Sequence, residues 1–267
     1  MSRAFGGARI WRLLPLVVIT ALAAAVALVV RNPERLEPAR SWCAPSSARP
    51  LGCGEGGTNL LAVVAHAEVR AVALAIAVAL FSLAVGTPLG ATAALVRGRF
   101  ERGVLRACDL LQAFPSFLLA LVVLSAVRTP GRVHIGAVFA LTSWAPFARL
   151  ALVQTRVLRD QPFVEAARAL GVTWRVVLTR HVLPNLVGVA AVQLGATAGA
   201  IVVSEAALGF VGLGPRDGVS LGSVLDQGVA AMLRAPHVLF VGAAAVFVTS
   251  AAMLLAGRAI EAEAART

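Results

Sequence analysis

The sequence predicts an all-α, polytopic membrane protein with six transmembrane helices and a long polar loop between the fourth and the fifth. Of its 267 residues, 59% are hydrophobic and 14% are charged, and the mean hydropathy is +0.85. A soluble domain carries more charge than this, so most of the chain is expected to lie in lipid. The 24 basic residues are all arginine and lie mainly in short segments between apolar runs. That distribution is typical of membrane topology rather than of nucleic-acid binding.

Six apolar runs are long enough to cross a bilayer. The first follows Arg3, Arg9 and Arg12 and would give roughly 27 Å of helix. A cleaved signal peptide is the alternative, but we favour an uncleaved span because the run is longer than a typical signal core. The six runs are Leu13–Val30, Ala71–Leu95, Leu110–Val127, Ile135–Val153, Leu186–Leu208 and Val238–Ala256.

A polar connection, predicted over residues 31–68, separates the first two spans and is rich in Pro, Gly and Ser. It contains Cys43 and Cys53, which an oxidising compartment would allow to pair, although two unpaired thiols fit the sequence equally well. Cys108, near a predicted membrane boundary, is interpreted as a small apolar filler. The predicted organisation is an arm and first span over 1–30, this connection, a transmembrane domain of five helices over 69–258, and a tail over 259–267.

Two glycine pairs predict close contacts between helices. Gly86 and Gly90 lie four residues apart in the second run, and Gly195 and Gly199 do so in the fifth. Small residues at this spacing allow another helix backbone to approach. Prolines inside the runs are tolerable where neighbouring helices satisfy the freed carbonyl groups; they are Pro88, Pro115 and Pro146.

The arginine distribution also predicts the orientation. Arginines concentrate in the N-terminal arm, in the short segment 97–106, in the central segment from Arg156 and in the tail. By the positive-inside rule, both termini and the central loop are expected to be cytoplasmic.

The polar loop at residues 160–185 is predicted to hold two short helices. Asp160 and Gln161 can cap the first, whose first turn takes Pro162, where a missing N–H costs little. Gly171 is placed to end this helix in a left-handed conformation. Thr173 can cap the second helix, which is predicted to continue toward the proline at position 184.

The first of these helices is amphipathic. Apolar residues recur along it at helical spacing, so that they share one face; they are Phe163, Ala166, Ala167 and Leu170. A short helix between two membrane spans has nothing in its own segment to cover such a face. We therefore expect a partner protein to cover it.

The sequence offers little catalytic chemistry. A phosphate-binding loop of the G-x-x-x-x-G-K-[ST] type is missing, as is any lysine that could complete one. The His, Cys and carboxylate residues have no metal-ligand spacing, and nothing aligns a nucleophile with a base. Charges inside the predicted spans are nearly confined to Arg149 and Glu205, whereas a proton- or sodium-coupled carrier is expected to place more of them near the midplane.

The polar loop resembles the EAA loop of binding-protein-dependent ABC importers. Both halves of that motif are present at the family spacing: Glu165, Ala166, Ala167 and Gly171, then His181, Leu183, Pro184 and Asn185. From about Pro50 to the end, the chain resembles the C-type permease of the dipeptide/oligopeptide/nickel subfamily. The matching stretches are DxxxxFPxxLLA at 109–120, WxxFARL at 144–150 and EAxLxFxGLG at 205–214.

Two regions depart from the subfamily pattern. Residues 49–59 keep Pro50, Leu51, Gly52 and Gly57 but lose the acidic and basic positions of the subfamily, and residues 218–222 lack its tryptophan. Both regions are predicted to lie outside the cytoplasm. The resemblance therefore leaves the docking of a binding protein and the identity of the cargo open.

The resemblance implies a permease subunit of the inner membrane, which would form half of a translocation pathway with a homologous second permease. It implies cytoplasmic ATP-binding-cassette ATPases docked on the loop and an extracytoplasmic substrate-binding protein. Nucleotide-driven closure of the ATPases would pull on the loop and rock the two permeases. It implies no cofactor, metal or catalytic residue in this chain, because ATP hydrolysis would occur only in the partner ATPases.

The residues of the loop take their roles from this resemblance. Glu165 would cap and orient the coupling helix, Gly171 would permit the sharp turn, and Ala166 and Ala167 would keep the docking face flat. The alternative is a helix that merely lies at the membrane interface. Peptides are the first expected cargo and nickel the second, while a non-transporting scaffold or a secondary transporter are the alternatives to an importer.

Overall fold

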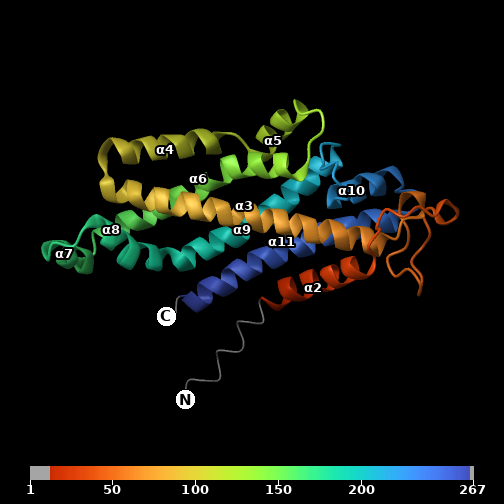
Figure 1. Ribbon diagram of the computed structural model, residues 1–267, viewed down its shortest axis with the longest axis horizontal. Helices are drawn as coiled ribbons and strands as arrows, with labels where there is room; N and C mark the ends of the chain where they lie inside the picture. The colour runs from red at the N-terminus through yellow and green to blue at the C-terminus, as the bar shows by residue number, and fades with distance from the viewer. Residues whose placement is uncertain (1–12, 265–267) are drawn as a thin grey trace, which may run out of the picture.

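The computed structural model describes residues 13–264 as an elongated bundle of helices (Figure 1). The prediction of an all-α membrane protein is confirmed, since the described residues form helices and only two isolated β-bridges. The α-helices are α2 (Leu14–Val29), α3 (Leu60–Val96), α4 (Gly98–Ala113), α5 (Ser116–Ser125), α6 (Arg132–Arg159), α7 (Pro162–Ala169), α8 (Trp174–Val177), α9 (Leu183–Phe210), α10 (Leu221–Ala230) and α11 (Pro236–Ala264).

The count of six spans is not confirmed. Four helices are long and apolar enough to cross a membrane: α3, α6, α11 and the continuous helical segment Trp174–Phe210. The pair α4–α5 makes a fifth span if its two bent parts are counted together, and α2 is a shorter apolar helix of 16 residues. The predicted arm before residue 13 and the end of the predicted tail lie outside the described residues.

The predicted span Leu110–Val127 is broken, which corrects the expectation of one transmembrane helix over this run. Helix α4 ends at Ala113, and α5 begins at Ser116 after a bend of 72°. Phe114 is extended, with φ −106° and ψ 134°. Pro115 causes this break, because proline lacks the N–H of a helical hydrogen bond and disfavours helical geometry in the residue before it. Pro88 and Pro146, by contrast, lie inside tightly packed helices that stay continuous.

The second predicted span also begins earlier than expected. The side chain of Asn59 accepts a hydrogen bond from the Leu61 N–H (3.2 Å) and caps α3. Residues 60–68, assigned to the polar connection, therefore belong to the helix. Glu68 lies within it and is buried, and the Thr249 hydroxyl donates to its carboxylate (3.3 Å). Glu68 is thus a further charged residue inside a long apolar helix, which the sequence did not predict because polar residues between 66 and 70 made this helical stretch look like a loop.

The rest of the connection folds back on itself at one end of the molecule, beside α10 (Figure 1). Cys43 and Cys53 form a disulfide, with their Cα atoms 4.8 Å apart. The guanidinium of Arg49 donates to the Glu37 carboxylate (2.7 Å) and to the Gly57 carbonyl (2.8 Å). The disulfide and these hydrogen bonds hold the connection together in a compact form, although it contains no long helix.

The two glycine pairs lie at close helix–helix contacts, as the sequence predicts. Gly86 and Gly90 on α3 face the backbone of α6 around Trp144 and Ala148. On α9, Gly195 and Gly199 face α11, where a Cβ on Gly199 would lie 2.9 Å from the Ser250 carbonyl oxygen. These helices touch through their backbones, which adds dispersion contacts that larger side chains would prevent.

Substitution of Gly90 by alanine is expected to destabilise the bundle. The added Cβ would overlap the backbone of Ala148, so α3 and α6 must move apart, at a cost of about 1–3 kcal/mol. Thermal unfolding in detergent, followed through the reaction of buried Cys108 with a thiol dye, should begin at a lower temperature. Gly103→Ala is the matched control, because a Cβ on Gly103 has no atom within 4 Å. Equal unfolding temperatures for the two variants would contradict the close-contact interpretation.

Candidate functional site

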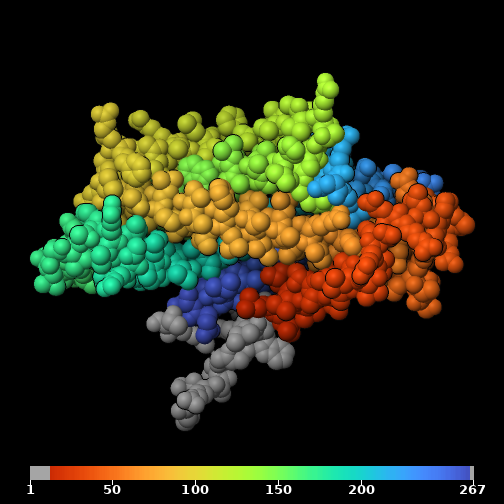
Figure 2. Space-filling view, viewed as in Figure 1, coloured from red at the N-terminus to blue at the C-terminus, as the bar shows by residue number. Residues whose placement is uncertain are grey.

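The polar loop forms the end of the molecule opposite the disulfide-containing connection (Figures 1 and 2). Helix α7 begins as predicted, with Gln161 as the N-cap residue and Pro162 in the first turn. The Gln161 side chain accepts no capping hydrogen bond. Asp160 does not cap α7 either, since its carboxylate pairs with Arg97 (3.2 Å) and with Arg159 (3.5 Å). The start of α7 is therefore held by proline and by ion pairs rather than by a side-chain cap.

Gly171 ends α7 in the left-handed conformation that the sequence predicts. Its φ is +82°, and a Cβ there would have no atom within 4 Å. Two backbone hydrogen bonds close the end of the helix, from Gly171 N–H to the Arg168 carbonyl (2.9 Å) and from Val172 N–H to the Ala167 carbonyl (3.1 Å). This pair of bonds is a Schellman motif, which turns the chain sharply and satisfies carbonyl groups at the helix end.

Two side chains of α7, Arg168 and Phe163, hold it against the segment that follows. The Arg168 guanidinium lies 4.2 Å from the centre of the Trp174 ring and donates to the Val172 carbonyl (2.8 Å). The rings of Phe163 and His181 lie 6.1 Å apart, centre to centre. Because Phe163 is in α7 and His181 follows α8, the two halves of the predicted motif are joined in space.

One side of the loop is packed into the molecule. Val164 is 1% exposed, and Val177 and Val182 are fully buried. They belong to a small apolar cluster that includes Leu95 from α3 and Ala151 from α6. Valine at 164, which the predicted amphipathic face did not include, is therefore the residue that anchors α7 to the bundle.

The opposite side of the loop is apolar and exposed. Phe163 is 44% exposed and Leu170 is 85% exposed, and Trp174 and Val176 are partly exposed as well. Large apolar side chains gathered at one tip are typical of a surface that a partner covers. The face that the sequence predicts to need a partner is thus largely uncovered in this chain.

The second helix of the loop does not stop near Pro184. Helix α8 passes into a π-helical turn, Leu178–Val182, and then into α9 without a break. In this turn the Leu183 N–H bonds to the Leu178 carbonyl, five residues back. A π turn changes the hydrogen-bond register of a helix. Here it ends two residues before Pro184, which has no N–H to donate. The Asn185 side chain donates to the His181 carbonyl (2.6 Å) across the same turn.

The predicted motif residues fall into an exposed and an inner group. Glu165, Ala166, Pro184 and Asn185 are exposed, whereas Ala167, His181 and Leu183 are partly buried. Within residues 13–264, the Glu165 side chain forms no hydrogen bond or ion pair. Its position in the first turn of α7 places its charge near the positive end of the helix dipole.

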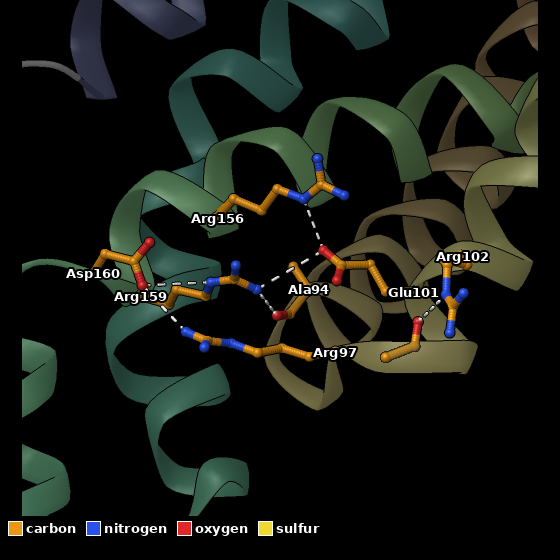
Figure 3. A network of polar contacts seen from close by, with 8 residues as sticks. Ala94, Arg97, Glu101, Arg102, Arg156, Arg159 and Asp160 are labelled. Carbon is orange, nitrogen blue, oxygen red and sulfur yellow. Dashed lines mark hydrogen bonds and ion pairs between the residues drawn. The ribbon is translucent and has the colours of Figure 1, made fainter.

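An ionic network holds the root of the loop (Figure 3). Glu101, in the first turn of α4, accepts a hydrogen bond from Arg156 (2.7 Å) and lies 3.8 Å from Arg159. Arg159 also donates to the Ala94 carbonyl near the end of α3. Asp160 connects the network to Arg97. The network joins the ends of α3, α4 and α6 at the point where the chain enters the loop.

Sequence reasoning missed this network because it treated these arginines only as markers of topology. Glu101 was the available signal, since it is the one acidic residue among the arginines of segment 97–106. Its partners lie more than 50 residues away, so no local pattern identifies them. The other charge noted at the sequence level, Arg149, pairs with Asp109 of α4.

Chemistry at the loop is limited to packing and ion pairing. Among residues 13–264, His, Cys, Asp and Glu form no group of three that could hold a metal ion. Glu205 in α9 is 2% exposed, and one of its carboxylate oxygens has no hydrogen-bond partner in the described part of the chain. It lies far along α9 from the loop and contributes nothing to the tip.

Comparison with known proteins places the chain among transport components. The family model described as binding-protein-dependent transport system inner membrane component matches residues 86–265. The glutathione transport system permease protein GsiD of Pectobacterium atrosepticum is 33% identical over 218 residues, which cover 80% of this chain and 71% of the relative. The proteins of that name from Shigella dysenteriae and Escherichia coli O6:K15:H31 are 35% and 34% identical over 214 residues, covering 80% of this chain and 70% of each relative.

Removal of the Glu101 charge is expected to loosen the root of the loop. Glu101→Gln keeps the size of the side chain but removes its negative charge, so the ion pairs with Arg156 and Arg159 are lost and only hydrogen bonding to an uncharged amide oxygen remains, a local loss of about 1–3 kcal/mol. Hydrogen–deuterium exchange of the backbone between residues 153 and 164 should become faster. Glu55→Gln, on the exposed connection at the other end of the chain, is the matched control and should leave this segment unchanged. Unchanged exchange in Glu101→Gln would show that the network does not hold the loop.

Proposed function

The chain belongs to the family of binding-protein-dependent transport system inner membrane components, and we propose that the exposed tip at residues 160–185 couples it to a cytoplasmic ATPase. The protein is a multi-pass inner-membrane permease subunit of an ABC importer. The single observation that carries the proposal is the tip itself, where two short helices meet at Gly171 and present an uncovered apolar face. A partner with a complementary apolar groove would bury that face.

The roles of the motif residues follow from where they lie. Ala166 is exposed beside Phe163 and Leu170, so its small side chain leaves room for a partner surface. Glu165 is exposed and without an ion pair in the described chain, which leaves its charge free for a contact across the interface. Gly171 sets the angle between the two helices. The ring of His181 packs near that of Phe163 and helps to hold it in place. Leu183, Pro184 and Asn185 form the start of α9, which carries motion of the tip into the membrane.

Partner subunits would complete the transporter. ATP would be bound and hydrolysed by ATP-binding-cassette subunits, since this chain lacks a phosphate-binding loop and any lysine. A homologous second permease would supply the other half of the pathway, and a substrate-binding protein would deliver cargo from outside. Closure of the ATPases would displace the tip and rock the two permeases between outward and inward access.

Short peptides are the proposed cargo. The similar permeases named above carry glutathione in their names, and glutathione is a tripeptide.

The complex purified through a tag on this chain should contain ATPase subunits and, in proteoliposomes, should take up labelled glutathione when ATP is supplied. The chain purified alone should hydrolyse no ATP. A complex that never contains an ATPase would instead support a non-transporting scaffold, which the altered segments 49–59 and 218–222 favour.

The orientation can be tested with reporter fusions that are active only outside the cytoplasm. Fusions after Arg49 and near Asp217 should be active, and fusions after Arg102 and Thr173 should be silent, because arginine-rich segments stay in the cytoplasm. A fusion after Arg266, beyond the described residues, should also be silent. Activity at Thr173 would refute the coupling role, since the tip must face the ATPases.

Gly171→Val tests the coupling role most directly. A β-branched residue at φ +82° costs about 1–3 kcal/mol of backbone strain. A Cβ at this position has no atom of the described chain within 4 Å, so membrane insertion should survive while the angle between α7 and α8 changes. ATPase copurification and peptide uptake should be lost, and Glu165→Ala should reduce both more mildly.

Gly212→Val is the matched control for this substitution. Gly212 has nearly the same conformation, φ +81°, and also has no atom within 4 Å of a Cβ. It lies just after α9, at the end of that helix away from the tip. ATPase association should survive in this variant. Normal uptake and ATPase binding by Gly171→Val would contradict the coupling role and would indicate that the loop helix merely lies at the membrane interface.

A further inference from the structure

A cavity of about 510 Å³ lies where the break between α4 and α5 faces the middle of α6 and α9. Phe114 and Pro115 form its wall at the break, and Pro146 and Ile201 contribute apolar walls from α6 and α9. It is one of several hollows in the described chain, but it lies between helices halfway along the membrane-spanning bundle. It is separate from the tip at residues 160–185.

The polar lining of this cavity carries no charge. Its polar residues have hydroxyl or amide side chains, and neither a carboxylate, an arginine nor a histidine is among the described residues that line it; they are Gln112, Ser116, Thr142, Ser143, Gln193, Thr197 and Ser204. Gln193 donates to the Thr197 hydroxyl (3.1 Å). This bond leaves the Gln193 carbonyl oxygen and the Thr197 proton available to a solute.

Neutral hydrogen-bonding groups at this depth require a partner. Polar groups inside a membrane are satisfied by protein or by water in a cavity, because lipid offers no hydrogen bonds. Thr142 donates to carbonyl groups of its own helix, and the remaining four of these side chains form no hydrogen bond within residues 13–264. The opposite side of α6 differs, since Leu141 is apolar and 62% exposed. Helix α6 thus has one side suited to water and one suited to lipid.

We propose that a short peptide passes through this cavity during transport and that the peptide backbone contacts the cavity lining. The inference rests on the proposed function and names the groups that contact the cargo. A glutamine side chain is itself an amide, so Gln112 and Gln193 can donate to and accept from peptide groups as those groups do to one another. A bare divalent metal ion would instead need carboxylate, imidazole or thiolate ligands. The cavity offers none of these, so nickel is disfavoured as the species that it contacts.

Thiol labelling tests whether the cavity is aqueous. In a Cys108→Ala background, Ser143→Cys in the assembled complex should react with a membrane-impermeant thiol reagent, whereas Leu141→Cys, two residues away on the opposite side of α6, should not. Excess S-methylglutathione, which has no free thiol to consume the reagent, should slow the labelling of Ser143→Cys, and nickel ions should not. Equal labelling at both positions, or protection by nickel alone, would overturn the inference. An unreactive Ser143→Cys would mean that the second permease fills the cavity, which would overturn it as well.

Uptake tests the contact with the cargo. Gln193→Leu keeps the volume of the side chain but removes its amide, so ATP-dependent uptake of glutathione should fall about tenfold. ATPase subunits should still copurify with this variant. Thr20→Val is the matched control, because it removes a hydroxyl on α2 that bonds only to its own helix; its uptake should stay at the wild-type rate.

The two proposals fail in different ways. If the unmodified complex takes up glutathione but Gln193→Leu does so equally well, the cavity assignment is wrong and the importer proposal stands. If the unmodified complex contains no ATPase and takes up no peptide, the proposed function is wrong. Should Gln193→Leu fail to assemble, the labelling of Ser143→Cys decides the cavity assignment alone.

Discussion

The close backbone contact between α3 and α6 is the constraint on which the rest of the structure depends. Apolar side chains gain little from burial against each other in lipid, so helices hold together in a membrane through packing and hydrogen bonds. Gly86 and Gly90 let α6 approach until the two backbones touch. That contact lies on either side of Pro146, through which α6 stays continuous, and it fixes where the end of α6, Arg159, lies relative to α3. The loop that follows Arg159 is positioned from this fixed point.

The loop is held by two kinds of interaction near the start of α7. Ion pairs around Glu101 fix the chain where it enters the loop, and Val164 anchors the helix in the apolar cluster. At the other end of α7, backbone hydrogen bonds close the turn at Gly171, and Arg168 adds contacts with Val172 and Trp174 across it. One side of the loop is therefore fixed to the bundle, while its outer side stays largely exposed. Such an arrangement suits a surface that must transmit force to the helices behind it.

Features that depend on local conformation could be predicted from the sequence. Gly171 ends α7 as expected because only glycine adopts a positive φ without a Cβ clash, and the glycine pairs mark helix contacts because their spacing places them on one face. Features that depend on tertiary packing could not. Pro115 breaks its helix while Pro88 and Pro146 do not, and the difference lies in how tightly each helix is packed rather than in its neighbours in sequence. The partners of Glu101 and the buried position of Glu68 depend equally on residues far away in the chain.

Helix α9 connects the tip with the cavity. The helical segment Trp174–Phe210 is continuous, and it carries His181 near one end and Gln193 and Thr197 further along. A continuous helix moves as one body, so displacement of the tip must shift the cavity-lining side chains relative to α6 or bend α9 between them. The π turn at Leu178–Val182 is the place where bending is easiest, since its hydrogen bonds are out of the α-helical register. Beyond that turn, Gly195 and Gly199 tie α9 to α11. Motion of the tip is therefore either absorbed at the π turn or passed to α9 and α11 together, and in the second case the cavity changes shape without any helix unfolding.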